Sequence, residues 1–470
     1  RAYAYTVAAM YGEPGALRKD ATVSVDVTTE AVEGETHAIH FNRGSPATQE
    51  YARRFQNRPP SEVGQAAYDW LSRGLVESIK GFIQRAVDGK FALKGAFYEF
   101  QWADVLDELR AAKGRGVDVD IVFDDIDNAT GPHTKNEAAI KAARIKSLTT
   151  PRSNGTLMHN KFIVLLERDQ PRAVLFGSTN LTENGLFGHA NCAHIVENAD
   201  IAGKYFAFYE KLTGDPETGR GSDYKTWTIE QTPAPASRYV EGMAPVFSPR
   251  ANLEALDWYA ELAGAAANAL FMTFAFGMNT NFRDVYAKDD DVLRFGLMEK
   301  EWNGANKEAQ IAAIRKLQAR TNVVIAIGNY ISLNKFDQWV KELNRVTAEV
   351  NVRWVHLKFM LVDPLSDHPV VVTGSANFSD ASTRANDENM LVIKDDTRVA
   401  DIYLGEYMRL YSHYAYREAV QIFLEKNPNA SPDDMAKFGF LIEDGDWTTT
   451  YFDPKDRSAR MARRLYFAGK

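Results

Sequence analysis

The chain has 470 residues and a mass of 52.7 kDa, enough for two or three domains with a substantial core. Its 45% hydrophobic and 25% charged residues are typical of globular proteins and exclude disordered, collagenous and coiled-coil chains. No apolar run reaches the roughly 18 residues that a bilayer-spanning helix needs. The net charge of −8 argues against overall attraction to polyanions but leaves room for a local basic site.

The compartment stays open from the sequence. Cys192 is the single cysteine, so an internal disulfide is excluded, but a lone thiol is compatible with both secreted and cytoplasmic proteins. The chain begins with Arg1 and shows no signal pattern, so an earlier presequence could have been removed. We therefore leave the localisation unknown.

The first half of the chain is expected to contain an entry segment and an α/β lobe. Residues 1–58 should be β-rich, because Val23–Val27 alternates as a half-buried strand does. The first lobe is assigned to residues 59–212. Within it the sequence predicts, in chain order, a strand, a helix, a strand and a helix: Leu93–Phe100, Val105–Lys113, Val117–Phe123 and Asn136–Lys146.

The second half is expected to repeat this layout. Residues 213–250 are rich in Gly, Pro, Asp, Thr and Ser without a clear period and predict a linker. The second lobe is assigned to residues 251–426, followed by a tail, 427–470, that packs on the lobes. This alternation predicts an α/β fold with two similar lobes related by a pseudo-twofold axis, each a mixed, mostly parallel sheet flanked by helices. The expected strands of the second half are Leu270–Gly277, Val323–Ile327 and Val370–Thr373.

A duplicated motif is the most informative feature of the sequence. A His-x-Lys tripeptide is followed by an apolar run and then by a Gly-Ser-x-Asn turn, once in each half. The Gly lies 18 residues after the His in both copies, without a gap. The two copies are His159, Lys161 and Gly177-Ser178-Thr179-Asn180, and His356, Lys358 and Gly374-Ser375-Ala376-Asn377.

This motif has the chemistry of a phosphate site. Alternate residues of a strand share a face, so His-x-Lys places an imidazole beside an ammonium. The hydroxyl and amide of the turn can donate hydrogen bonds to phosphoryl oxygens. A single copy would more often be a strand end in solvent, whereas two copies at one spacing favour a shared site. The predicted catalytic residues are His159, Lys161, Asn180, His356, Lys358 and Asn377, with Ser178 and Ser375 as substrate-binding residues.

With these motifs the chain resembles the phospholipase D superfamily, whose signature is His-x-Lys-x4-Asp followed by Gly-Ser-x-Asn, present twice. The second copy matches in full, with Asp363 as the acid. In the first copy that position is Leu166, and Glu167 follows one residue later. The resemblance implies that this acid is more structural than catalytic, so the chemistry is expected to be intact.

The resemblance implies hydrolysis of a phosphodiester in two steps through a covalent phosphohistidine. One neutral imidazole attacks phosphorus, while the opposite imidazolium protonates the leaving oxygen and later activates water or an alcohol. The lysines and asparagines stabilise the charge that a metal ion stabilises in other sites, so no metal or other cofactor is expected. Consistent with this, Asp289–Asp291 is interpreted as a solvated acidic turn.

The two halves differ 32 residues after each histidine, where the first half has Asn191 and the second has Glu388. In the family an acidic residue near this place often hydrogen-bonds the far nitrogen of its own histidine. We therefore expect Asn191 beside His159 and Glu388 beside His356. A carboxylate would favour the imidazolium form of His356 as general acid, whereas an amide would leave His159 neutral as the nucleophile.

Other candidates lie at the strand ends where α/β sheets carry their sites. His194 is expected to be a buried structural residue, and His189 either lines the pocket or is exposed. Asp124 and Asp125 would shape the entrance or cap the next element. For the aromatic candidates, core packing is the alternative. The substrate-binding candidates are Phe97, Tyr98 and Phe274, with Glu99 and Phe276 beside them.

Fold and motif indicate the reaction class and not the substrate. The net charge and the lack of basic runs near the motifs favour phospholipid headgroup release, with transfer to an alcohol and peripheral membrane contact as compatible features. No basic amphipathic helix for a membrane surface is obvious. A nuclease, a transferase and an inactive phosphate-binding scaffold are the alternatives. Because both halves lie in one chain, we expect an active monomer. The feature that favours a nuclease is an Arg-bearing tail, better explained as an exposed helix face: Arg457, Arg460, Arg463 and Arg464.

Overall fold

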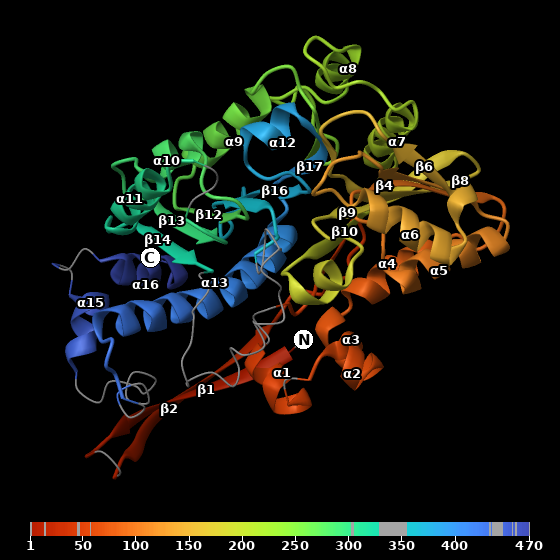
Figure 1. Ribbon diagram of the computed structural model, residues 1–470. Coiled ribbons are helices and arrows are strands. Elements are labelled where there is room, and N and C mark those ends of the chain that lie inside the picture. The colour runs from red at the N-terminus through yellow and green to blue at the C-terminus, as the bar shows by residue number, and fades with distance from the viewer. Residues whose placement is uncertain are drawn as a thin grey trace.

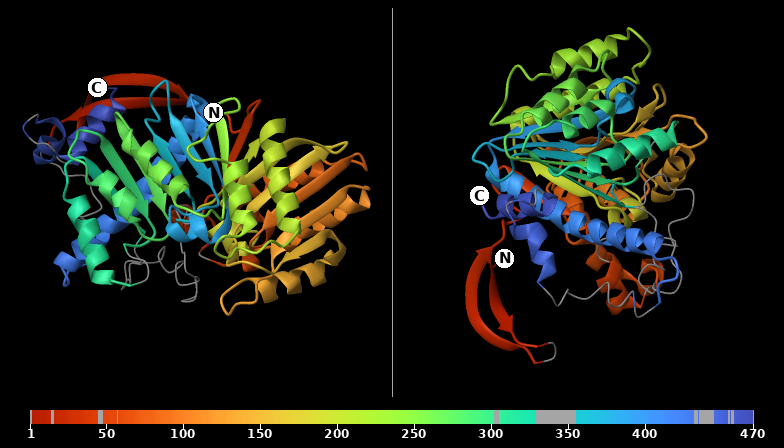
Figure 2. Two further views of the ribbon diagram at one scale, coloured as in Figure 1. Left: turned by 90° about the horizontal axis from the view of Figure 1, so that it is seen from above. Right: turned by 90° about the vertical axis from the view of Figure 1, so that its left-hand side faces the viewer.

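The structure is a computed structural model of the chain. It describes residues 2–13, 16–44, 48–56, 58–301, 305–328, 355–431, 434, 445–453, 455 and 458–469. Within these ranges the chain forms two large sheets, each flanked by helices, which lie next to one another, and a separate two-stranded sheet (Figures 1 and 2).

The first sheet has seven strands in the order β3-β10-β9-β8-β4-β5-β6. Its strands β4, β5 and β6 run parallel, and the other neighbouring pairs are antiparallel. The bounds are β3 His37–Phe41, β4 Phe91–Phe97, β5 Asp118–Asp124, β6 Thr149–Arg152, β8 Lys161–Glu167, β9 Gln170–Gly177 and β10 Cys192–Val196.

The second sheet repeats this order as β11-β17-β16-β15-β12-β13-β14, and among neighbours on this path again only the last three strands run parallel to one another. The prediction of two similar lobes with mixed sheets is therefore confirmed. The prediction that most pairs are parallel is wrong, because the motif-bearing strands are joined by short antiparallel connections. The bounds are β11 Met243–Ser248, β12 Ala269–Phe274, β13 Leu293–Met298, β14 Val323–Ile327, β15 Phe359–Val362, β16 Val370–Gly374 and β17 Asn386–Lys394.

Helices cover the sheets and join the lobes. The helix predicted over Val105–Lys113 lies within α5, and the one predicted over Asn136–Lys146 overlaps α6. Helix α13 contacts both β3 and β14, so it runs along both lobes (Figure 1). The main helices are α4 Leu75–Gln84, α5 Ala103–Gly114, α6 His133–Ala143, α7 Ala199–Thr213, α9 Glu254–Gly264, α10 Thr280–Tyr286, α11 Lys307–Gln318 and α13 Thr397–Lys426.

One hydrophobic core crosses the boundary between the lobes. Phe208 of α7 stacks on Phe247 of β11 with ring centroids 4.3 Å apart, so a helix of the first lobe packs on a strand of the second. Phe359 of β15 packs edge-on against Tyr403 of α13, which also contacts Phe41 of β3. Because these rings are buried in one cluster, the two lobes are held in a fixed relation.

Two strand contacts between the lobes position the motifs. The short strand β7 (Leu157–Met158) pairs in parallel with the start of β17, where Asp387 lies opposite Met158. The N–H of His159 then donates to the carbonyl of Asp387 at 2.9 Å. In the same way Ala190 forms a parallel bridge with Val355, the residue before His356. The residue before each motif histidine is therefore paired with a segment of the opposite half.

The amino-terminal segment differs from the prediction in its burial. Strands β1 (Ala2–Tyr11) and β2 (Arg18–Thr28) form a hairpin that projects from the lobes (Figure 1). The predicted strand Val23–Val27 is present in β2, but all of β2 is exposed, so the prediction that it is half-buried is wrong. Strand β3 already belongs to the first sheet, which therefore begins before the boundary predicted at residue 59.

Residues 213–250 are more ordered than their composition suggested. They contain helix α8 (Asp223–Gln231) and strand β11, which is an edge of the second sheet. The helix begins at Ser222, whose hydroxyl accepts from the N–H of Lys225, and its apolar residues show little periodicity. The tail carries the helices α15 (Thr449–Phe452) and α16 (Ala459–Phe467). None of the described helices has the length and apolarity needed to cross a bilayer.

The glycine of each Gly-Ser-x-Asn turn is required by a close approach of two strands. A Cβ atom at Gly177 would collide with the carbonyl oxygen of Cys192, and one at Gly374 with that of Asn389. In both lobes the obstacle is the backbone of the neighbouring strand, which cannot move without breaking the ladder. This explains why the motif starts with glycine in both copies.

Gly374→Ala should therefore lower the free energy of unfolding by about 2 kcal/mol, because overpacking forces the backbone apart. The matched control is Gly405→Ala in α13, where the added methyl meets open space and alanine favours the helix by up to about 1 kcal/mol. Calorimetric melting of both variants checks this. Equal melting temperatures would contradict the role assigned to Gly374.

Candidate active site

The two motif histidines meet at the boundary between the lobes. The ring centroids of His159 and His356 lie 6.4 Å apart, and the rings are nearly perpendicular. Both side chains are almost fully buried, at 7% and 6% exposure. Reacting atoms in productive complexes lie roughly 3–3.5 Å apart, so one phosphorus atom fits between a nitrogen of each ring. The structure therefore brings the duplicated motifs into one site.

Each histidine is paired with a residue of the other half. The Nδ1 of His159 lies 2.9 Å from Oε2 of Glu388, and the Nδ1 of His356 lies 2.8 Å from Oδ1 of Asn191. The prediction that each pairs within its own half is wrong. The reason is the strand contacts between the lobes, which place the start of β17 beside His159 and residue 190 beside His356.

These partners fix the tautomer of both rings. The Oδ1 of Asn191 accepts from Ser178 at 2.8 Å, while its Nδ2 donates to the carbonyl of Gly185 at 2.7 Å, so the amide orientation is set. An amide oxygen and a carboxylate can only accept, so His356 and His159 donate Nδ1–H to them. The Nε2 atom of each neutral ring therefore carries a lone pair and is available for the chemistry.

The motif serines do not play the predicted role. The hydroxyl of Ser178 donates to Asn191, and that of Ser375 donates to Glu388 at 2.7 Å; both serines are fully buried. They thus hold the partners of the histidines instead of contacting a substrate. This contact could not be read from the motif, because Glu388 lies on the neighbouring strand β17.

The motif lysines are buried beside the histidines. Lys161 donates to the carbonyl of His159 at 2.6 Å, and Lys358 to that of His356 at 2.5 Å. Burial lowers the pKa of Lys161 to about 7 and, together with the charge of Lys161, holds the pKa of Lys358 well below its ordinary value. Two buried ammonium groups, of which Lys161 lowers the pKa of Lys358, favour binding of an anion, which would raise both pKa values again.

The imidazoles rest neutral for the same reason. Burial lowers the pKa of His159 to about 4, although Glu388 opposes this shift. Burial, and next the charge of Lys358, hold the pKa of His356 well below its ordinary value, which favours the neutral ring; the carboxylate expected to stabilise its imidazolium is not its partner. Burial alone would favour the neutral acid of Glu388, but His159 and Lys161 hold the pKa of this carboxyl below its usual range.

The motif asparagines complete the site. The Nδ2 of Asn180 donates to Oε2 of Glu99, and the Oδ1 atoms of Asn180 and Asn377 are buried without a partner among the described residues. Burial raises the pKa of Glu99, which faces the charge of Lys161. Asn180 follows β9 and Asn377 follows β16, and the ends of these strands lie beside the starts of β8 and β15, where the motif histidines are.

Of the aromatic candidates, only Tyr98 lies at the reaction centre. Its ring centroid is 5.1 Å from that of His159, and the Nζ of Lys161 lies 5.2 Å above the ring. Phe97 stacks on Phe100 in the core, and Phe274 packs against other rings of the second lobe, so their prediction as substrate-binding residues is wrong. Adjacent residues of a strand point to opposite faces, which separates Phe97 from Tyr98.

In each lobe one carboxylate accepts a hydrogen bond from the backbone just before the motif histidine. The N–H of Met158 donates to Asp124 at 2.8 Å, and that of Val355 donates to Glu299 at 2.9 Å. Asp124 ends β5 and Glu299 follows β13, so they are equivalent in the two lobes. From the sequence, Asp124 was expected at the entrance or as a cap, and Glu299 was not expected at all. The available signal was the position of each acid at the end of a strand, Asp124 at the end of β5 and Glu299 directly after the apolar strand β13.

Residues that could hold a metal ion lie outside this constellation. Among the described residues, Asp125, His133 and Glu137 offer three ligand atoms within 4.8 Å of one another. Asp125 and His133 Nδ1 are 2.7 Å apart and already hydrogen-bonded. The sequence signal was the spacing of His133 and Glu137 by one helical turn. Asp290, in the predicted acidic turn, instead pairs with Arg294.

In the second copy the acid that follows His-x-Lys, Asp363, has a structural role. The carboxylate of Asp363 accepts three backbone N–H groups, those of residues 267–269, at 2.6–2.8 Å. It fixes the turn before β12. In the first copy Leu166 is buried in the core, and Glu167 makes a surface ion pair with Arg172. The substitution therefore changes a turn and leaves the histidines in place.

The two other candidate histidines, His194 and His189, have different environments. The Nε2 of His194 lies 2.9 Å from Nδ1 of His37 and its Nδ1 lies 3.1 Å from the hydroxyl of Tyr403, which confirms a buried structural role. His189 is buried with its ring centroid 5.7 Å from that of His356. Burial, and then the charge of Lys358, lower the pKa of His189 to about 4, so it adds no charge to the site.

A family model matches the chain in two segments, residues 83–213 and 300–410, which together make up more than half of it. The model is described as "Cardiolipin synthase, PLD-like domain". The first segment contains the first His-x-Lys and Gly-Ser-x-Asn motifs, and the second contains the other pair. A comparison with curated proteins finds no match.

Solved structures with a similar fold share little sequence identity with the chain. Phosphatidylserine synthase from Haemophilus influenzae Rd KW20 is 14% identical over 77% of this chain and 92% of its own, with a TM-score of 0.49. Yeast tyrosyl-DNA phosphodiesterase is 14% identical over 68% and 88%, with a TM-score of 0.37. Polyphosphate kinase from Porphyromonas gingivalis is 13% identical over 69% of this chain, with a TM-score of 0.42, and the chain spans 43% of that kinase.

The crosswise partners predict how isosteric changes shift the histidine pKa values. Asn191→Asp places a carboxylate beside His356 and should raise the pKa of that ring by about 1–2 units. Histidine titration followed by NMR measures this. His194, which contacts neither partner, is the internal control. A shift of His159 in place of His356 would show that the pairing is not crosswise.

Proposed function

The chain belongs to the phospholipase D-like family of phosphodiesterases, and we propose that it hydrolyses a phospholipid, releasing the headgroup through a covalent phosphohistidine. The observation that supports this chemistry is the pair of imidazoles facing one another at 6.4 Å, with a buried ammonium group beside each. The proposed mechanism uses no metal ion, because side-chain cations and amides stabilise the charge of the reacting group.

His159 is the nucleophile in this scheme. When its Nε2 forms a bond to phosphorus, the ring retains its Nδ1–H and becomes positively charged. The carboxylate of Glu388, 2.9 Å from Nδ1, stabilises that charge. The sequence led to the same nucleophile from the opposite pairing. The geometry supports it for a different reason, since a carboxylate assists the ring that gains charge.

His356 is the general acid and base. It must carry a proton before the P–O bond breaks, and the anionic diester raises its pKa when it binds. Its Nε2–H is then given to the leaving oxygen, and in the second step the same nitrogen removes a proton from water as the P–N bond breaks. Asn191 orients this ring without a charge that would retain the proton.

The charge of the five-coordinate phosphorus is stabilised by four side chains in this scheme, Lys161, Lys358, Asn180 and Asn377. The ammonium groups are desolvated, which strengthens their interaction with an anion. The amides act as oriented donors from both lobes, because each follows the strand next to its histidine. The pseudo-twofold arrangement thus surrounds one phosphoryl group.

The contacts of the arginines in the tail favour a lipid substrate over nucleic acid. Arg464 donates to the carbonyl of Tyr451 at 2.7 Å and lies over the ring of Phe452, and Arg463 donates to the hydroxyl of Tyr411 at 3.3 Å. These guanidinium groups pack on the protein and are not free to track a phosphate backbone. Arg457 lies outside the described residues.

Trapping the intermediate tests the mechanism. With a labelled diester that has a good leaving group, His356→Ala should still accumulate labelled enzyme, because its nucleophile is intact and its second step is slow. His159→Ala should give no label. Rapid-quench experiments measure this, with His194→Gln as a control outside the site. Labelling that survives only in His159→Ala would reverse the roles.

A parallel assay tests the substrate. Hydrolysis of phosphatidylcholine micelles and of single-stranded DNA is compared at two salt concentrations with EDTA present. We expect lipid hydrolysis with little salt dependence and at least 10-fold slower cleavage of DNA. Preferred DNA cleavage with a steep loss of activity at high salt would indicate a nuclease instead. No hydrolysis of either substrate or of bis(p-nitrophenyl) phosphate between pH 4 and 9 would favour an inactive scaffold.

A further inference from the structure

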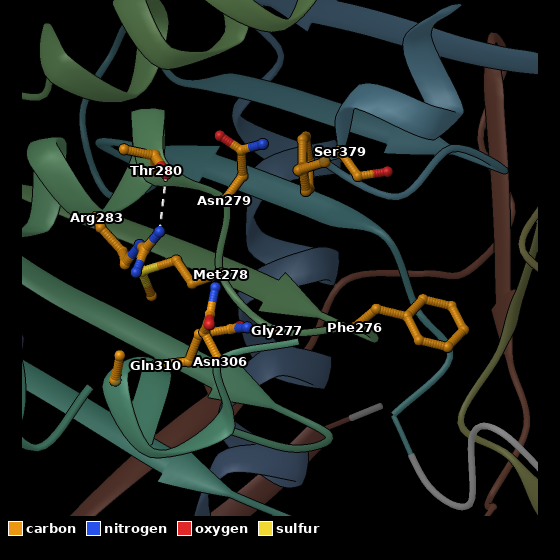
Figure 3. A pocket seen from close by; sticks show the side chains of 11 residues that line it. Phe276, Gly277, Met278, Asn279, Thr280, Arg283, Asn306, Gln310 and Ser379 are labelled. Atoms are coloured by element: carbon orange, nitrogen blue, oxygen red, sulfur yellow. Dashed lines mark hydrogen bonds between the residues drawn. The ribbon is translucent and has the colours of Figure 1, made fainter. Parts of the chain in front are cut away.

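A cavity of ≈ 420 Å³ lies in the second lobe, next to the Gly-Ser-x-Asn turn (Figure 3). Its size falls in the range of small-molecule sites, roughly 300–1,000 Å³. It is bounded by the segment after β12, the first turn of α10 and the first turn of α11. The lining residues are Phe276, Gly277, Met278, Asn279, Thr280, Arg283, Asn306, Ala309, Gln310, Phe378 and Ser379.

The equivalent place in the first lobe is filled. There α6 follows β5, as α11 follows β13 in the second lobe. From α6 the buried side chain of Asn136 donates to the carbonyls of Tyr98 and Asp124 and accepts from the N–H of Phe100, all at 2.8–2.9 Å. A buried side chain placed like Asn136 would fill the cavity of the second lobe. Among the described residues, the side chain of Asn136 thus occupies the place in the first lobe that corresponds to the cavity.

The cavity is connected to the second motif through Ser379. Ser379 lies two residues after the motif Asn377 and donates its N–H to the carbonyl of that residue at 2.8 Å. By strand register, Phe276 occupies the position that Glu99 has in the first lobe, where Glu99 contacts the motif Asn180. The ring of Phe276 lies at one end of the cavity, apart from the polar lining (Figure 3).

The charge of the lining residues determines which ligands the cavity can bind. Arg283 is its only ionic side chain among the described residues; one guanidinium nitrogen donates to Thr280 at 2.8 Å, and its Nε is buried without a partner. Amides and hydroxyls supply the remaining polar groups, and Lys300 already lies 5.4 Å from the ring of Phe276. A cationic headgroup would meet Arg283 in the lining and Lys300 nearby, and no carboxylate among the described lining residues. A neutral polyol or an anion would meet matching donors.

We propose that this cavity binds the alcohol part of the leaving group, and that it selects polyhydroxylated headgroups over quaternary ammonium headgroups. The inference rests on the proposed function, in which His159 attacks from the first lobe. The leaving oxygen then departs in line toward His356, on the side where the cavity lies. The alcohol that carries this oxygen enters the cavity and is held by Arg283 and the surrounding amides.

The test compares three short-chain lipids that share their acyl chains and differ in the headgroup, which is glycerol, inositol or choline. The wild type should prefer glycerol and inositol. Arg283→Gln should raise KM for these two about 10-fold and change KM for the choline lipid less than 2-fold. Asn306→Gly, which keeps a left-handed backbone position, should act in the same direction. Arg172→Gln, in a surface ion pair of the first lobe, is the matched control.

Two further readouts separate this inference from the proposed function. Turnover of bis(p-nitrophenyl) phosphate by the wild type reports whether the site hydrolyses a diester at all, and it should be the same in the control Arg172→Gln. Calorimetric binding of sn-glycerol 3-phosphate reports the cavity without turnover and should weaken about 10-fold in Arg283→Gln. Normal diester turnover with no change in binding or headgroup preference would overturn the inference alone. Absent diester turnover in the wild type would overturn the proposed function, while the binding result still decides the cavity.

Discussion

The active site depends on the backbone pairing between the lobes. Strand β7 pairs with the start of β17, and Ala190 bridges to Val355, so each histidine follows a segment that is hydrogen-bonded to the opposite half. Neither lobe alone contains a histidine together with the residue that orients it. The fixed register places Glu388 on His159 and Asn191 on His356. The catalytic geometry is thus a property of the interface, which the shared aromatic core holds rigid.

A buried polar network keeps this pairing in place. The carboxylate of Asp387 accepts from Arg152 and from the hydroxyl of Tyr224, each at 3.0 Å, and Arg152 also pairs with Asp215 at 2.7 Å. Burial raises the pKa of Asp387 to about 6 against the effect of Arg152. Removal of one partner would leave a buried charge uncompensated, which typically costs about 3–5 kcal/mol. The network therefore specifies where β17 begins, directly before Glu388.

The pseudo-twofold symmetry is broken at the partners of the two histidines. The histidines have a carboxylate on one side and an amide on the other, which suits a ring that gains charge and a ring that transfers a proton. The same asymmetry continues outward. The first lobe has Tyr98 and Glu99 next to its motif and the buried side chain of Asn136, whereas the second has Phe276 and a cavity. The duplicated fold thus presents two different sides to the space between the two histidines.

The sequence by itself determined the duplicated motif, the two α/β lobes and several strands and helices, since these follow from local spacing and periodicity; β14 begins and ends where predicted. The crosswise pairing was decided by tertiary structure, because a count of residues along the chain cannot show which strand of the other half lies nearest. Burial also decided the resting charge of His356, which an exposed carboxylate pair would have reversed. For Phe97 and Tyr98 the strand register decided which of two neighbours faces the site, because a shift of one residue exchanges the faces.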